Sequence, residues 1–175
     1  MQHKISATLI ALAASGWMWS AHAHTPAQWQ AMTSNLQVSL EQAVVQASQA
    51  VAGQVIDIEV DDGDGAGVRY EAKVLTPAGE RIEVWVDGQS GQARQHEHDG
   101  KAKRKDMDRA AQAKIDIQQA IAAATKHTPG KPVKAELDSH WGKTTYQVDV
   151  LQADYTVMEV KLDAADGSVI RSKKD

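Results

Sequence analysis

The sequence predicts an α+β fold of two tandem repeats, each with one helix packed on a three-stranded antiparallel meander. The first observation is internal similarity: the segment from Ser39 to Asp61 matches the segment from Asp116 to Asp138 at one constant offset. The second is that, within each copy, apolar residues change from helical spacing to strict alternation after a glycine. Because order and spacing are both kept, we interpret the chain as two copies of one unit.

The first residues predict a secretory signal peptide over residues 1–23. Lys4 supplies a positive charge, residues 5–19 are mostly apolar, and Ala21-His22-Ala23 fits the small-x-small cleavage pattern. This apolar run is too short and interrupted for a membrane-spanning helix, and no second one follows. The chain has no Cys, which excludes a disulfide scaffold and leaves no site for lipid attachment. We therefore expect an exported protein, periplasmic or secreted.

The first repeat is predicted over residues 37–94, after an N-terminal helical segment over residues 24–36 in which Thr25 is the cap and Pro26 the first helical residue. Ser39 with Gln42 is a capping box that predicts the start of the main helix. Gly53 suits the left-handed position that ends a helix. Three alternating runs follow, separated by the turn sequences DDGDGAG and TPAGE, and they predict the meander.

The second repeat is predicted over residues 114–175 and has the same order of elements. Asp116 with Gln119 is its capping box, and Gly130 takes the place of Gly53. Between the repeats, residues 95–113 are charged and contain histidines, which predicts a solvated linker.

Both copies carry a common signature of a glycine after the helix, a tyrosine in the second strand, and Asp-x-x-x-Gly after the third strand. The residues are Gly53, Tyr70, Asp87 and Gly91 in the first copy, and Gly130, Tyr146, Asp163 and Gly167 in the second. In this order, and in two copies, the signature resembles the PepSY domain. The resemblance implies a domain without catalytic residues. Such domains occur in the propeptides of thermolysin-like proteases, which they inhibit or chaperone, and as free-standing exported or membrane-attached bacterial proteins.

The stretch VDGQSG, residues 86–91, invites a catalytic interpretation that its context excludes. A nucleophilic serine elbow needs Gly-x-Ser-x-Gly between a strand and a helix. Here Gln92 occupies the last position, no helical pattern follows, and Asp166 replaces Ser90 in the second copy. We expect no enzymatic activity and no cofactor, with a hydrolase as the most distant option. The formal net charge of −4 argues against a nucleic-acid partner.

The predicted linker also offers a possible metal site at His96, His98 and Asp99. Imidazole and carboxylate groups suit Zn, Cu or Ni. The second copy has no equivalent histidines, and a polar solvated segment explains the tract more simply. A periplasmic metal-binding or metal-sensing protein is therefore the alternative functional hypothesis.

Two tryptophans are candidate anchors for a partner. Alternation places Trp85 on the outer side of its strand, where it either packs against the other repeat or Trp29, or contacts a partner. Trp141 lies in a predicted turn. We expect a non-enzymatic binding or regulatory protein whose partner is a protein or peptide, such as a peptidase or a sensor.

Overall fold

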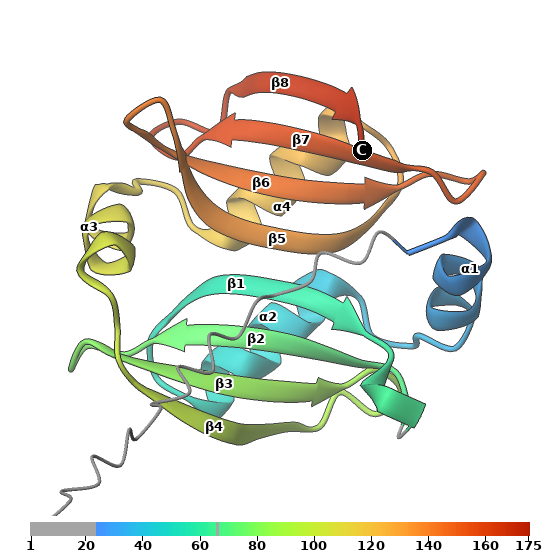
Figure 1. The fold of residues 1–175 in the computed structure, drawn as a ribbon, viewed down its shortest axis with the longest axis horizontal. Helices are drawn as coiled ribbons and strands as arrows, with labels where there is room; N and C mark the ends of the chain where they lie inside the picture. The colour runs from blue at the N-terminus through green and yellow to red at the C-terminus, as the bar shows by residue number, and fades with distance from the viewer. Residues whose placement is uncertain (1–23, 66) are drawn as a thin grey trace, which may run out of the picture.

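The computed structural model describes residues 24–65 and 67–175, in which eight strands form one antiparallel sheet in the order β4-β3-β2-β1-β5-β6-β7-β8 (Figure 1). Two helices, α2 and α4, pack on one face of the sheet (Figure 1). The predicted α+β class and the two repeats are confirmed. The predicted signal peptide lies outside the described residues.

The elements follow the order in which the two repeats occur along the chain. They are α1 (Pro26–Ser34), α2 (Leu40–Ala50), β1 (Gln54–Asp61), η1 (Gly63–Gly65), β2 (Arg69–Leu75), β3 (Glu80–Asp87), β4 (Ala93–Lys101), α3 (Arg104–Gln112), α4 (Ile117–His127), β5 (Lys131–His140), β6 (Lys143–Leu151), β7 (Val157–Asp163) and β8 (Val169–Lys174).

The main helices begin where the capping boxes predict. The Ser39 hydroxyl accepts from the Gln42 backbone N–H at 3.3 Å, and the Gln42 side chain accepts from the Ser39 N–H at 2.8 Å. Asp116 and Gln119 form the same pair of bonds in the second repeat. These bonds satisfy backbone donors that have no partner within the helix. Each helix then turns a stripe of small and branched side chains toward the sheet, led by Leu40 in α2 and Ile117 in α4.

Gly53 and Gly130 have a different role from the predicted helix cap. Both main helices end in an extended cap residue, Val51 and Thr128, and neither glycine has a positive φ. A Cβ on Gly130 would lie 2.6 Å from the Leu151 carbonyl oxygen. Glycine is required because the chain leaving the helix passes directly against the backbone that ends the second strand.

Each repeat has a fourth strand in addition to the predicted three. Residues 93–101 form β4 and residues 169–174 form β8, at the two edges of the sheet. Part of the predicted linker is therefore strand β4, and α3 occupies most of the remainder. Neither β4 nor α3 contains a buried residue, so the apolar pattern that reveals the other elements is missing here.

The repeats join through β1 and β5, a pairing that we call the seam. Its register pairs are Asp57 with Glu136, Ile58 with Ala135, and Glu59 with Lys134. Ile58 and Ala135 are equivalent positions in the two copies, so the repeats are related by an approximate two-fold axis through this pair. The helices α3 and α1 lie at opposite ends of the seam (Figure 1).

The tyrosines of the repeated signature fix the chain that enters each main helix. Tyr70 is 1% exposed and its hydroxyl donates to the Val38 carbonyl oxygen at 2.5 Å. Tyr146 is fully buried and donates in the same way to Ile115 at 3.1 Å. Burial raises the pKa of Tyr146 to about 12 and raises the pKa of Tyr70 as well. Both phenols therefore remain neutral donors at physiological pH.

The Asp-x-x-x-Gly element closes the turn between the third and fourth strands. The Asp87 carboxylate accepts from the Ser90 N–H at 2.7 Å and from the Ser90 hydroxyl at 2.8 Å. These bonds hold the pKa of Asp87 below its usual value. Gly91 and Gly167 follow with φ of 73° and 76°, a conformation that favours glycine. Ser90 therefore contributes to a turn between two strands.

Candidate functional site

The sheet face opposite α2 and α4 carries charged and polar side chains from one edge to the other, and we call it the open face. Register places its residues in rows that cross both repeats. They are Asp57, Glu59, Asp61, Arg69, Glu71, Lys73, Arg81, Glu83, Trp85, Lys134, Glu136, Asp138, Gln147, Asp149, Glu159, Lys161, Arg171 and Lys173. Such a face is typical of a one-sided antiparallel sheet, whose second face meets water or a partner.

Lys134 lies at the centre of the open face, on the seam. Its ammonium group is 3.3 Å from Glu136 and 3.7 Å from Glu59. Burial by itself lowers the pKa of Lys134, but the surrounding carboxylates outweigh this effect and raise it. Burial, followed by repulsion from Asp57, raises the pKa of Glu59 to about 7. Burial likewise raises the pKa of Asp149 to about 6. The centre of the face therefore gains protons close to neutral pH.

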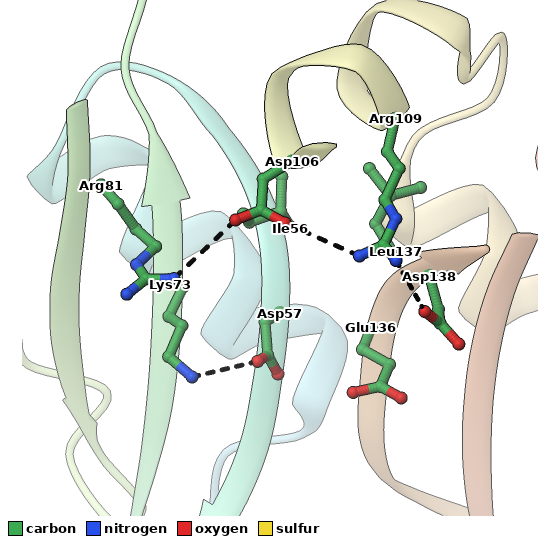
Figure 2. Close-up of a pocket in the computed structure, with 9 residues that line it drawn as sticks. All are labelled: Ile56, Asp57, Lys73, Arg81, Asp106, Arg109, Glu136, Leu137 and Asp138. Carbon is green, nitrogen blue, oxygen red and sulfur yellow. Dashed lines mark hydrogen bonds and ion pairs between the residues drawn. The ribbon is translucent and has the colours of Figure 1, made fainter. Parts of the chain in front are cut away.

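Helix α3 crosses one end of the seam and closes a small charged cleft of about 150 Å³ (Figure 2). Asp106 is 3.6 Å from Arg109 and 3.8 Å from Arg81, while Arg109 reaches Asp138 at 3.2 Å. The cleft is lined by Ile56, Asp57, Lys73, Arg81, Asp106, Arg109, Glu136, Leu137 and Asp138. These are paired ions and apolar side chains, and the lining includes no serine, histidine or cysteine nucleophile. The ion pairs of Asp106 with Arg81 and of Arg109 with Asp138 therefore connect α3 to both repeats.

Trp85 is the largest side chain on the open face, and its neighbours in the first repeat hold it in place. Its ring stacks on His96 of β4 with centroids 3.4 Å apart, and the Arg69 guanidinium of β2 lies 3.7 Å from the ring centroid. Its indole N–H donates to Glu83 at 2.7 Å. The described ring partner of Trp29 is His24, so Trp29 does not supply the predicted packing. The Arg–Trp–His stack is a partly exposed platform built from three neighbouring strands, β2, β3 and β4.

Trp141 lies away from this platform, at the tip of the hairpin between β5 and β6. Its side chain is 92% exposed. Trp141 has φ of 53° and Gly142 has φ of 78°, as in a two-residue type I′ turn. The structure therefore places the two predicted anchors on different elements of different repeats.

The predicted metal residues do not form one cluster. A register shift in β4 puts His98 opposite Ile82, whereas His96 stacks on Trp85 on the open face. His98 contacts Glu80 at 3.3 Å, and Asp99 accepts from Arg81 at 2.8 Å. Within residues 24–65 and 67–175, the one set of three ligand side chains with atoms within 4.8 Å of one another is Glu83, Glu97 and Asp99. It shares only Asp99 with the predicted set, so a site at His96 and His98 stays a prediction.

Sequence reasoning missed Arg69 as a partner of Trp85, and it missed Lys134 and α3 at the seam. The contact of Arg69 with Trp85 depends on which residues the β-ladder places side by side. The positions of Lys134 and α3 at the seam depend on how the two repeats pair. The available signals were an Arg directly before the signature residue Tyr70 and a lone Lys, Lys134, in an acidic alternating run. In the described part of the chain, no helix has the length and hydrophobicity needed to span a bilayer.

Comparison with known proteins identifies the repeats. No curated protein matches the chain. A solved structure, that of a candidate lipoprotein from Clostridium difficile 630, is 17% identical, with 82% of this chain and 97% of that chain covered and a TM-score of 0.45. The family model described as "Peptidase propeptide and YPEB domain" matches twice, over residues 37–96 and 114–173. The chain therefore belongs to the PepSY family and carries two PepSY domains in tandem.

Proposed function

We propose that this chain is an exported, non-enzymatic binding protein that regulates an envelope protein, in the first instance a peptidase, by docking it on the open face. The observation that carries the proposal is the Arg69–Trp85–His96 platform, an aromatic stack on the charged sheet face opposite α2 and α4. Tryptophan and arginine are the side chains that most often dominate binding energy at protein interfaces.

The chemistry of the open face supports binding over catalysis. Its carboxylates and bases are engaged with one another across the sheet, as in the pairs of Lys73 with Asp57 at 3.2 Å and Arg171 with Glu159 at 3.0 Å. Ser90, the serine considered as a nucleophile, is bonded into a turn with Asp87. A peptidase is the favoured partner because the family description names peptidase propeptides.

A peptidase assay tests the proposal. Purified protein is titrated into a thermolysin-like zinc peptidase and into the peptidase activity of an envelope extract, and inhibition constants are measured. Trp85→Ala should weaken inhibition by at least about tenfold, because it removes the centre of the platform. Gln118→Ala, on the exposed side of α4, is the matched control and should leave inhibition unchanged. Thermal unfolding of both variants shows that the fold is kept.

Two results would count against the proposal in different ways. Binding of an envelope protein without inhibition would remove the peptidase while leaving the docking role. Equal inhibition by Trp85→Ala and the unaltered protein would remove the platform from the interface.

A further inference from the structure

A second surface, separate from the open face, lies where α3 meets the β5–β6 hairpin, and we call it the basic end. It comprises Lys101, Lys103, Arg104, Lys105, Trp141 and Lys143, all of which are exposed. Arg104 contacts Asp108 at 3.7 Å, with side chains 94% and 59% exposed. Asp108 cancels the charge of Arg104, so the net positive charge of the basic end comes from its four lysines.

The acidic residue of the first turn of α3 faces inward. Asp106 has a side chain only 12% exposed and lies between Arg81 and Arg109, so its charge is neutralised inside the cleft. The lysines on either side of Arg104 point into solvent. The outer surface at the start of α3 is therefore positive, although the whole chain is acidic.

Direct contacts hold α3 against the hairpin that carries Trp141. Arg109 donates to the Ser139 hydroxyl at 2.8 Å, and the Thr144 hydroxyl and the Gln112 side chain bond at 2.8 Å. Figure 1 shows α3 and the β5–β6 hairpin at the same end of the sheet. The later turns of α3 are therefore fixed against the hairpin, and the start of the helix lies at the same end of the sheet as Trp141.

Trp141 is an unfavourable residue for folding at this position. It is 92% exposed and has a left-handed backbone, in the first position of a turn where Asn is preferred. A bulky side chain in this conformation is strained, and strain of this kind is found at functional sites. The equivalent loop of the first repeat, residues 62–68, has no aromatic residue.

We propose that the basic end binds an anionic lipid surface, with Trp141 inserted at the level of the headgroups. Tryptophan is favoured at the membrane–water interface, and clustered lysines are attracted to anionic lipids. The positive side chains are long, exposed and spread over a helix start and a hairpin tip, which suits the diffuse charge of a bilayer. Met107, 45% exposed on α3, adds apolar surface nearby. An acidic protein is the competing partner, and the experiment must distinguish it from an anionic lipid surface.

The test is vesicle co-sedimentation with residues 24–175, which contain every described helix and strand and the whole described core. Vesicles of phosphatidylglycerol with phosphatidylcholine are compared with phosphatidylcholine alone, at about 0.05 M and about 0.5 M NaCl. We expect binding to the anionic vesicles that falls at high salt. Lys103→Glu/Lys105→Glu should lower the partition coefficient by at least about tenfold.

Matched variants away from the basic end separate a local site from general charge. Lys126→Glu/Lys174→Glu makes the same change in net charge at two other exposed lysines, and should change binding less than twofold. Trp141→Asn should weaken binding on the order of tenfold while keeping the turn, because Asn tolerates a left-handed backbone. Ile170→Asn, at a side chain 46% exposed, is its control and should bind normally.

Any of three results would overturn the proposal. These are equal binding to neutral vesicles, equal losses in the control variants, and retention of an acidic protein by the basic end without any binding to vesicles. Inhibition of a peptidase through the open face is measured without lipid, so failure of either proposal leaves the other standing.

Discussion

Glu59 provides a sharp test of the electrostatics at the seam. Its side chain is 26% exposed and lies 3.7 Å from Lys134. Burial, then repulsion from Asp57, raises the pKa of Glu59 from 4.5 to about 7. A raised carboxyl pKa means that the folded protein holds this proton more tightly than the unfolded chain. Glu59 therefore destabilises the fold above pH 7, and this cost disappears as the pH falls toward 4.5.

The size of the effect follows from the pKa difference. A rise from 4.5 to about 7 corresponds to about 3 kcal/mol, and partial exposure of the side chain reduces this to about 2 kcal/mol. Glu59→Gln resembles the protonated form at every pH. We expect it to raise the free energy of unfolding by about 2 kcal/mol at pH 8 and to change it little at pH 4.5.

Urea denaturation at half-unit steps between pH 4.5 and pH 8, for the unaltered protein and the variant, measures this difference. Gln118→Ala, which removes no titratable group from the exposed side of α4, is the control and should give a difference that does not depend on pH. A Glu59→Gln difference that stays flat within about 0.5 kcal/mol, or that grows as the pH falls, would refute the reasoning.

Three further predictions concern the repeated signature. Gly130→Ala places a Cβ 2.6 Å from the Leu151 carbonyl oxygen and should cost about 2 kcal/mol in urea denaturation; a neutral result would contradict the close approach. Tyr70→Phe and Tyr146→Phe should each lower the free energy of unfolding by about 1 kcal/mol, since they remove equivalent hydrogen bonds, and unequal losses would count against the symmetry of the repeats. Ser90→Ala should change stability by less than about 0.5 kcal/mol and leave partner binding intact; lost binding would give Ser90 a role beyond its turn.

The features that sequence reasoning predicted correctly are local ones. A capping box such as Ser39 with Gln42 needs only four consecutive residues, and the Asp87-to-Gly91 turn needs five. Alternation identified the inner strands because their covered side chains are apolar, as Ile58 shows. Duplication strengthened each of these signals by presenting it twice.

The features that sequence reasoning missed depend on pairing between strands that are distant in the chain. β4 has no buried residue, because an edge strand needs backbone hydrogen bonds and no buried side chain. The stack of His96 on Trp85 follows from a register shift in β4 that no residue pattern encodes. The seam depends on how one repeat meets the other, and its equivalent residues, Ile58 and Ala135, show nothing in sequence beyond their membership of a strand.

Site-specific photocrosslinking in the producing cell tests the central claim, that the open face receives a partner. A benzoylphenylalanine at Gln147, on β6 in the open face, is compared with one at Ala122, exposed on α4 on the covered side. We predict a discrete adduct with an envelope protein from position 147, lost on adding Trp85→Ala, and none from position 122. Adducts from position 122 alone, or an adduct from position 147 that survives Trp85→Ala, would contradict the account.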